Sequence, residues 1–227
     1  MSILTGSLDN SNRGTLAATD KLTITSAGDV QRSEERPAGD VQNGNAGLIA
    51  SANGDVQLTA ASLGNARGSL QGQGAVTLDV GGDLDSQGGK VIAQTGDLLI
   101  KAGNLDNRGG VLSSIKGNFE SHVVGVLKNG YDLNRQGGLI QALRLTLNAQ
   151  GGIDNYGGRF VAQTGDVVID AGAAGNINNR DGIIQANGLL KVSGNDFDSS
   201  GDNGGQVAAG QIGRLLPARS TSSSVAP

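Results

Sequence analysis

Short segments in which every second residue is apolar recur along the whole chain. In Leu98-Leu99-Ile100-Lys101, Leu98 and Ile100 would lie on one side of an extended strand, and Leu99 and Lys101 on the other. The same pattern occurs at seven places: Leu22/Ile24, Val56/Leu58, Val76/Leu78, Leu98/Ile100, Leu145/Leu147, Val167/Ile169 and Leu190/Val192. No segment has helical periodicity over ten or more residues. The sequence therefore predicts an all-β protein.

A second strand is predicted shortly before each of these segments. Its inward positions combine a large apolar residue with a small one two positions later. The pairs are Leu16/Ala18, Leu48/Ala50, Val91/Ala93, Ile140/Ala142, Phe160/Ala162 and Ile184/Ala186. Because the second member is Ala each time, these strands are expected to face a narrow interior.

The strands belong to a repeat. The segment Leu105-Asp106-Asn107-Arg108-Gly109-Gly110 recurs, with changes, from Leu84, Leu133 and Ile153, and weaker copies begin at Leu8, Val41, Leu63, Ile177 and Phe197. From Val41 onward the spacings between copies are 22, 21, 21, 28, 20, 24 and 20 residues. The unit is therefore about 21 residues long, and about nine copies fill the chain.

A unit of this length cannot bury an apolar face alone, but stacked copies can. Each copy would pair its backbone with the copies above and below at about 4.8 Å per rung, so nine rungs would form a rod roughly 40 Å long. The repeat thus predicts a parallel β-helix, or β-solenoid, with Val, Ile and Leu inside.

One asparagine position recurs in the unit. It is occupied by Asn10, Asn43, Asn65, Asn107, Asn155 and Asn179. Stacked asparagines can hydrogen-bond to one another through their side-chain amides. We expect a structural amide ladder along the rod.

The period is interrupted twice. Residues 31–38 form a charged segment that contains a proline, and residues 121–130 enlarge the fifth unit, where an extra strand pair could cover the side of the rod. Residues 213–227 are rich in Ser and carry no repeat. The expected organisation is a repeat segment over residues 1–212 followed by a disordered tail.

Composition narrows the possible chemistry. The chain has 227 residues, of which 39 are Gly and 2% are aromatic; Cys is absent, and His occurs once. Disulfides, thiolate catalysis and sites with two imidazoles are thereby excluded. The net charge of −4 provides no general basic field for nucleic acid. No apolar run is long enough to span a membrane, and we expect no signal peptide in this chain, because its first residues lack a basic segment followed by an apolar one.

No catalytic, cofactor-binding or metal-binding residue is predicted. The only histidine, His122, has Glu120 as its only nearby candidate partner. The aspartates are spread over the repeats, as expected for turn residues, whereas carbohydrate-active β-helices gather carboxylates at one rung. The glycine-rich nonapeptide of calcium-binding β-rolls is also missing.

Arginines recur near one corner of the unit, at Arg13, Arg67, Arg108, Arg135 and Arg180. Stacked, they would form a weak basic stripe that could touch sulfated glycans or anionic surfaces. Neighbouring aspartates such as Asp106 and Asp181 offset this charge, so a solvated corner with local ion pairs is the simpler interpretation.

The order of residues in the unit, Leu-Asp-Asn-x-Gly-Gly followed by two strands around a Gly-Asp turn, resembles the haemagglutinin repeats of filamentous haemagglutinins. The resemblance covers roughly residues 6–212 and is clearest at 82–102 and 152–171. These repeats belong to large bacterial exoproteins exported by two-partner secretion, and they also form the shaft of contact-dependent growth-inhibition toxins. The resemblance implies a right-handed β-helix fibre, secreted through an outer-membrane transporter partner and displayed at the bacterial cell surface.

Three functional hypotheses follow from the resemblance and the residues. The chain would be a structural shaft segment of an adhesin, whose parent protein meets a host-cell or bacterial surface. Alternatively, it would itself be a binding module that contacts glycans or proteins. The third hypothesis is a carbohydrate-active enzyme. The open rungs of an isolated solenoid also lead us to expect end-to-end self-association.

Overall fold

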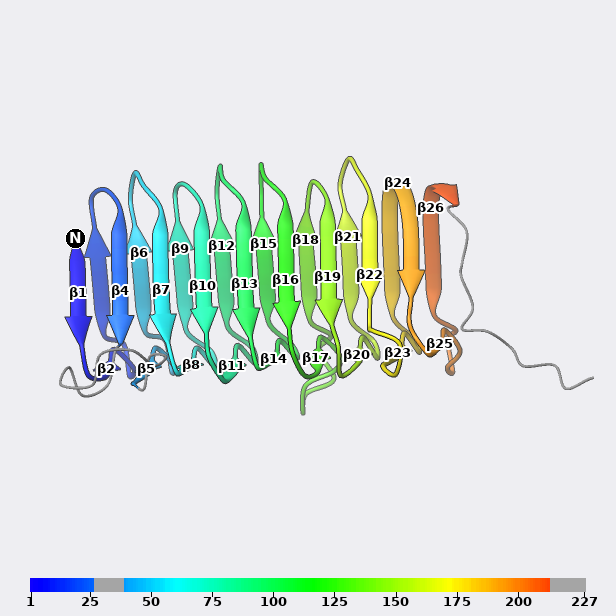
Figure 1. Ribbon diagram of the computed structural model, residues 1–227, viewed down its shortest axis with the longest axis horizontal. Coiled ribbons are helices and arrows are strands. Elements are labelled where there is room, and N and C mark those ends of the chain that lie inside the picture. The colour runs from blue at the N-terminus through cyan, green and yellow to red at the C-terminus, as the bar shows by residue number, and fades with distance from the viewer. Residues whose placement is uncertain (27–38, 213–227) are drawn as a thin grey trace, which may run out of the picture.

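The computed structural model of the chain describes residues 1–26 and 39–212, and these residues contain strands and turns but no helix. The chain winds into a solenoid (Figure 1), in which a coil consists of one short strand followed by two longer ones. All paired strands in the two sheets are parallel. The predicted all-β solenoid of about nine coils is therefore confirmed. The charged segment 31–38 and the tail 213–227 lie outside the described residues.

The short strands stack into a nine-stranded sheet, which we call the short sheet. Its members in order are β2 (Leu8–Asp9), β5 (Asp40–Gln42), β8 (Ser62–Gly64), β11 (Asp83–Asp85), β14 (Asn104–Asp106), β17 (Leu127–Lys128), β20 (Ile153–Asp154), β23 (Asn176–Asn178) and β25 (Asp196–Asp198). In Figure 1 this sheet forms the lower edge of the rod.

The longer strands form two faces that Figure 1 shows running between the short sheet and the upper turns. The first face contains β3 (Thr15–Ala18), β6 (Leu48–Ser51), β9 (Ser69–Gly72), β12 (Lys90–Ala93), β15 (Val111–Ser114), β18 (Leu139–Ala142), β21 (Arg159–Ala162) and β26 (Gln206–Ile212). The second face contains β1 (Ser2–Thr5), β4 (Leu22–Ser26), β7 (Val56–Ala60), β10 (Val76–Val80), β13 (Leu98–Ala102), β16 (Phe119–Val123), β19 (Leu145–Ala149) and β22 (Val167–Asp170). The long strand β24 (Ile183–Ser193) pairs with β21 and with β22, and so joins the two faces.

The register of the stack follows the repeat. Leu63 pairs with Leu84, and Leu84 pairs with Leu105, so equivalent residues lie 21 positions apart. Side chains that lie above one another in this way form continuous columns. Successive side chains point to opposite sides of a strand. If one strand slipped by one residue, its inward side chains would therefore turn to the solvent side and leave their columns.

The core consists of these inward columns. The fourteen apolar residues of the seven predicted pairs on the second face, Leu22/Ile24 to Leu190/Val192, are all buried. The short sheet adds Leu63, Leu84, Leu105, Leu127 and Ile153, each at most 2% exposed. Phe119 and Phe160 are the two largest buried side chains. Each fully buried aliphatic or Phe side chain contributes about 1.5–3 kcal/mol, which makes the thin core sufficient when it runs through all coils.

On the first face, one strand of the second coil is shifted from the predicted alternation. The sequence predicts that Leu48 and Ala50 point inward, but the structure buries Ile49 and Ser51 instead. Ile49 lies in register with Leu16 and Leu70, which fixes its direction. Ser51 tolerates burial because its hydroxyl donates to the carbonyl of Asp20 and accepts from the backbone N–H of Gly54.

The prediction of an insertion at residues 121–130 is wrong. Phe119–Val123 is a regular strand that pairs with β13 and β19, and Leu127–Lys128 is the regular short strand of the coil. The extra residues lie at 130–137, after Asn129. They form a projecting hairpin with an antiparallel bridge between Tyr131 and Gly137. Leu133, expected to begin a repeat copy, is fully exposed in this hairpin.

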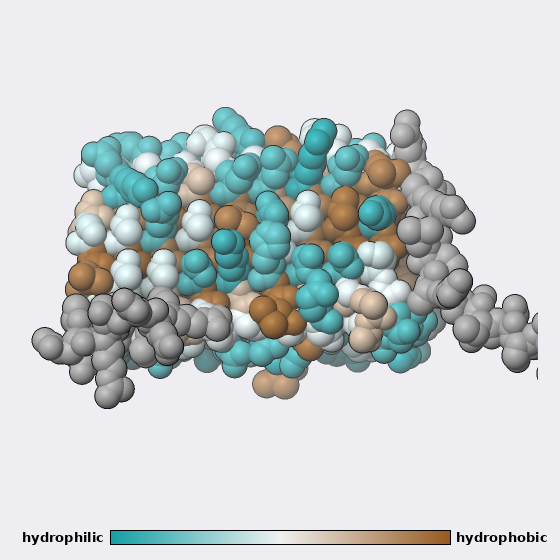
Figure 2. Space-filling model, in the orientation of Figure 1, coloured by the Kyte–Doolittle hydropathy of each residue, from teal (hydrophilic) through white to brown (hydrophobic). Residues whose placement is uncertain are grey.

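The surface of the rod is mixed in character. The side seen in Figure 2 carries hydrophilic and hydrophobic side chains next to one another along its length. Over the described part of the chain there is no helical segment with the length and apolarity needed to cross a bilayer.

Candidate functional site

The predicted asparagines lie at one corner of the coils, between the short sheet and the first face. Asn10 Nδ2 donates to Asn43 Oδ1 at 2.8 Å, and Asn43 Nδ2 donates to Asn65 Oδ1 at 2.9 Å. Farther along, Asn155 Nδ2 donates to Asn179 Oδ1 at 2.8 Å. Within these runs one amide donates to the next, and all six predicted members are at most 7% exposed. We call this row the asparagine ladder.

Sequence reasoning missed three members of the ladder. Asn129 accepts from Asn107 Nδ2 at 2.7 Å and donates to Asn155 at 2.8 Å. The hydroxyls of Ser86 and Ser199 occupy the corresponding position in two other coils. The signal for Asn129 was the segment Leu127-Lys128-Asn129-Gly130, which the better copy at Leu133 obscured.

The ladder is interrupted at Ser86. Asn65 Nδ2 donates to Ser86 Oγ at 3.3 Å, but no bond continues from Ser86 to the next coil. Asn107 Oδ1 is consequently buried without a hydrogen-bond partner among the described residues. A serine side chain is one bond shorter than asparagine, so it reaches one neighbour but not both.

The ladder also binds the corner to the strands that follow it. Asn43 Nδ2 donates to the carbonyl of Ser69, and Asn10 Nδ2 to that of Leu48. The glycine that closes each corner is required by this close packing: a Cβ on Gly110 would lie 2.3 Å from the carbonyl oxygen of Ser86 and 2.6 Å from Asn107 Oδ1. The role of these amides is therefore to hold the coil.

The structure does not bring the five predicted arginines into one stripe. Arg13 and Arg67 occupy one position of the corner, with Ala46 between them, and all three have positive φ (70°, 57° and 65°). Arg108 and Arg180 lie one position earlier in their corners, and Arg135 lies in the hairpin. A shallow hollow lies between Arg13 and Arg67, and Asn12, Asn45 and Ala46 also line it.

Two of the arginines are neutralised locally. Arg108 Nη2 lies 2.7 Å from Asp106 Oδ2, and its Nε also donates to this carboxylate, which raises the pKa of Arg108. Arg180 Nε lies 3.9 Å from Asp198 Oδ2. Such solvent-exposed pairs are screened by water and salt and contribute little to stability.

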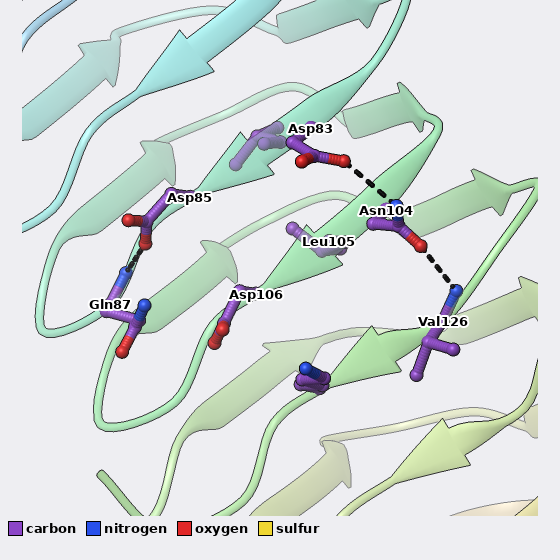
Figure 3. A pocket seen from close by; sticks show the side chains of 9 residues that line it. Asp83, Asp85, Gln87, Asn104, Leu105, Asp106 and Val126 are labelled. Atoms are coloured by element: carbon purple, nitrogen blue, oxygen red, sulfur yellow. Dashed lines mark hydrogen bonds between the residues drawn. The ribbon is translucent and has the colours of Figure 1, made fainter. Parts of the chain in front are cut away.

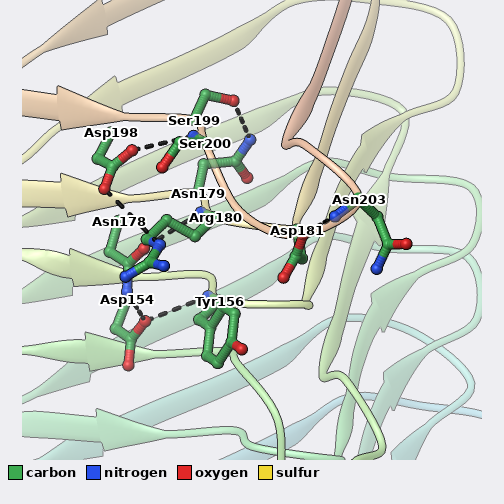
Figure 4. A network of polar contacts seen from close by, with 10 residues as sticks. All are labelled: Asp154, Tyr156, Asn178, Asn179, Arg180, Asp181, Asp198, Ser199, Ser200 and Asn203. Carbon is green, nitrogen blue, oxygen red and sulfur yellow. Dashed lines mark hydrogen bonds and ion pairs between the residues drawn. The ribbon is translucent and has the colours of Figure 1, made fainter.

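Aspartates at the ends of the short strands stabilise the corners. Asp154 Oδ1 accepts the backbone N–H of Tyr156, and Asp198 Oδ1 that of Ser200 (Figure 4). Hydrogen bonds from the Ser200 hydroxyl and backbone lower the pKa of Asp198. The same arrangement with Ser11 lowers the pKa of Asp9. These carboxylates are turn-forming groups of the kind that Asp supplies in loops.

A groove of about 390 Å³ crosses the short sheet over three coils. Leu84, Leu105 and Val126 line it together with Asp83, Asp85 and Asp106 (Figure 3). Asp83 Oδ1 accepts from Asn104 Nδ2 at 2.9 Å, and Asp85 Oδ1 accepts the N–H of Gln87 at 3.0 Å. In residues 1–26 and 39–212, no three His, Asp or Glu side chains are grouped so as to hold a metal ion.

The projecting hairpin is held together by Asp132. Its Oδ1 accepts the backbone N–H groups of Gln136 at 2.8 Å and Asn134 at 2.9 Å, which lowers the pKa of Asp132. Tyr131 packs edge-to-face against Tyr156, with ring centroids 5.2 Å apart, and the guanidinium of Arg135 lies 5.7 Å from the Tyr131 ring.

His122 forms one exposed polar pair. Its Nε2 lies 2.7 Å from Glu120 Oε1, and both side chains are about half exposed on the outer side of β16. Ser121, the residue between them, points into the core, where its hydroxyl has no partner among the described residues. The outward side of β16 therefore presents no nucleophile beside the pair.

Comparison with known proteins identifies one family. The family model described as "Haemagglutinin repeat" matches residues 3–34, 38–166 and 144–215, which together cover most of the chain. Neither the curated proteins nor the solved structures that were compared contain a significant match.

Proposed function

The chain belongs to the haemagglutinin repeat family, and from this membership we propose that it is a structural shaft segment of a secreted, surface-displayed bacterial adhesin. In this role it extends an adhesive or toxin-bearing tip away from the cell. The observation that carries the proposal is the unbroken parallel pairing of the described coils, from β2 to β25 in the short sheet and from β1 to β26 in the faces. A structure of this kind grows by one coil at a time and has no need of a separate globular core.

The geometry suits a rigid spacer. Strands run across the rod, so backbone hydrogen bonds run along it, and each additional coil lengthens it by about 4.8 Å. The asparagine ladder adds a row of buried hydrogen bonds parallel to these, which fixes the register of one corner. Bending the rod would stretch these hydrogen bonds on its convex side. The rod therefore resists bending and keeps its two ends at a fixed separation.

We propose no catalytic role for the segment. Families of haemagglutinin-repeat adhesins are generally non-enzymatic, and the carboxylates at the corners accept hydrogen bonds from their own turns. Turnover of a polysaccharide by the purified chain would contradict this part of the proposal.

Localisation and partners follow from the family as proposals. The parent protein is secreted or held at the bacterial surface, reaches it through an outer-membrane transporter, and meets a host-cell or bacterial surface. The isolated chain associates end to end, because strands at the ends of the described rod, such as β1 and β26, each pair with a neighbour on one side.

A second candidate function is binding by the segment itself. The observation in its favour is the hollow between Arg13 and Arg67, neither of which has an ion pair among the described residues. An anionic glycan lying along this corner would meet two guanidinium groups two coils apart.

Binding of the labelled chain to epithelial and bacterial cells separates the two candidates. A folded chain that shows no saturable binding supports the shaft. Saturable binding that is lost in a variant with Arg13→Glu and Arg67→Glu, but kept with Lys101→Glu on the second face, would replace the shaft by a binding module. Ile100→Asp provides the unfolded control.

A further inference from the structure

Five asparagines of the chain are followed directly by glycine: Asn43, Asn53, Asn129, Asn187 and Asn203. In such an Asn-Gly pair the backbone nitrogen of the glycine can attack the side-chain carbonyl carbon of the asparagine, because glycine has no Cβ to hinder the approach. The attack requires that the two atoms meet, that a base in solution reaches the glycine N–H, and that water is present to complete the reaction. The structure decides which of the five pairs meets these conditions.

Two of the pairs are held in the asparagine ladder. Asn43 and Asn129 are both 0% exposed. Each side chain accepts a hydrogen bond from the ladder member before it and donates one to the member after it. Because the amide is fixed and buried away from water, the hydrogen bonds that hold the corner also protect these two asparagines from attack.

The exposed pairs that begin at Asn53 and Asn187 are restrained by hydrogen bonds. The N–H of Gly54 donates to Ser51 Oγ at 3.0 Å, and the N–H of Gly188 donates to a backbone carbonyl of the preceding coil at 2.8 Å. The Asn187 side chain donates to a carbonyl of that coil as well. These bonds must open before the glycine nitrogen can lose its proton and meet the side chain.

The fifth pair is the least restrained. Asn203 is exposed, its side chain forms no hydrogen bond with any described residue, and Figure 4 shows it pointing away from the polar network. The N–H of Gly204 donates only to the carbonyl of Gly201, at 3.2 Å. Gly204 has a φ of +71°, and a Cβ built on it would meet no heavy atom within 4 Å. The loop therefore leaves room for the side chain to turn onto the glycine nitrogen.

We propose that Asn203 is the site at which the folded chain deamidates. The nitrogen of Gly204 gives its proton to a base in solution and bonds to Cγ of Asn203, and the side-chain amino group takes up a proton and leaves as ammonia. Water then opens the resulting cyclic imide at either carbonyl, which gives aspartate or isoaspartate. The net change consumes water, releases ammonia and needs no oxidant or cofactor. The modification goes beyond the shaft role and does not depend on it.

The reaction would change the last described coil. The backbone N–H of Asn203 donates to Asp181 Oδ1 at 2.7 Å, which ties the loop to the preceding coil. Deamidation adds a negative charge to the residue that this carboxylate contacts, and the repulsion weakens the tie. Isoaspartate also lengthens the main chain just before Gly205, where a Cβ would lie only 2.3 Å from the carbonyl oxygen of Asn179. We therefore expect deamidation to loosen β26, which begins at Gln206.

Mass spectrometry of the full chain, aged at mildly alkaline pH and then digested, tests the assignment. Fragment ions distinguish the five pairs, and ageing in heavy-oxygen water marks the products that form during the incubation. Asn203 should react roughly tenfold or more faster than Asn43 and Asn129, which need local opening first. Any other pair that reacts as fast as Asn203 in the folded chain would overturn the proposal. The same ranking in urea-unfolded chain would also overturn it, because the structure would then not be its cause.

Variants at exposed asparagines test the effect on the last coil. Asn203→Gln keeps the amide, but its longer side chain closes the ring far more slowly, so deamidation at this position should be lost. Asn53→Gln, at another exposed Asn-Gly pair, is the matched control and should leave the reaction at Asn203 unchanged. Hydrogen exchange of the β26 amides should accelerate on ageing in the unaltered chain and in Asn53→Gln, but not in Asn203→Gln. Unchanged exchange in a chain whose Asn203 has been converted would refute the loosening of β26.

Discussion

At the residue scale, the interior of the corner depends on side-chain length as much as on polarity. Asparagine spans the distance between coils because its amide both donates and accepts, as between Asn107 and Asn129. Ser86 accepts a hydrogen bond from Asn65 but donates none to the next coil. Asn107 Oδ1 is therefore left without a partner among the described residues.

Replacing this serine by asparagine should repair the ladder. In Ser86→Asn the new amide would donate to Asn107 Oδ1 and accept from Asn65 Nδ2, which should stabilise the chain by about 1 kcal/mol. Urea denaturation measures the change. Ser86→Ala is the matched control and should destabilise, because Asn65 Nδ2 loses its acceptor in the ladder. An unchanged stability of the Ser86→Asn variant would show that Asn107 Oδ1 is already satisfied by water.

The alternation on the second face predicts a sharp contrast between neighbours. Ile100 is fully buried between Leu78 and Ser121 of the adjacent coils, whereas Leu99 points outward. Ile100→Asp should cost about 4 kcal/mol or more, because an unpaired charge would enter the core. Leu99→Asp should change the stability little. Thermal unfolding by circular dichroism compares the two; similar melting curves would contradict the register.

At the element scale, the hairpin shows how a non-repeating segment is kept in place. Its fold rests on one carboxylate, Asp132, and on the packing of Tyr131 against Gly157 and Tyr156. Because neither feature repeats, the hairpin should open independently of the coils.

The lowered pKa of Asp132 gives this opening a pH dependence. A carboxyl whose pKa is depressed by folding stabilises the folded form above its unfolded pKa, about 3.9, and loses this contribution as the pH falls through the folded value. Hydrogen exchange at the amides of Asn134 and Gln136 should therefore accelerate, relative to the coils, in strongly acidic solution. Asp132→Ala should reproduce the loss of protection at neutral pH, and Asp79→Ala should not. Unchanged protection in Asp132→Ala would rule out this role.

At the scale of the whole molecule, the rod behaves as a row of coils, each held by its two neighbours. Its stability is therefore a matter of coil number and of uninterrupted register rather than of any single central cluster.

Deletion of one complete coil tests this view. Removing residues 84–104 joins Asp83 to Leu105 and keeps the register, since Leu84 and Leu105 are equivalent. We expect a folded rod about 4.8 Å shorter, in which Asn65 contacts Asn107 directly. Removing residues 84–94 instead should disrupt the fold, because strands of the two faces would be brought out of register. Circular dichroism and small-angle scattering compare the two; equal folding of both would argue against the stacked-coil architecture.

The sequence by itself determined the coil, its length and the inward residues of the second face. Those features are local and repeated: alternation sets which side chains point inward, and several copies of one pattern leave little ambiguity. It also marked the asparagine position, because a turn residue that recurs at a fixed place in each unit must stack.

Only the tertiary structure decided which of two similar segments enters the ladder. Leu127-Lys128-Asn129-Gly130 and Leu133-Asn134-Arg135-Gln136 both resemble the repeat, but the stack has room for one. Phe119–Val123 pairs with β13, so the chain reaches the short sheet at Leu127, which is buried, and the later copy is left outside as the hairpin. The direction of Ile49 was decided in the same way, by the residues of the neighbouring coils above and below it. Stacking is a contact between distant parts of the sequence, and no local pattern contains it.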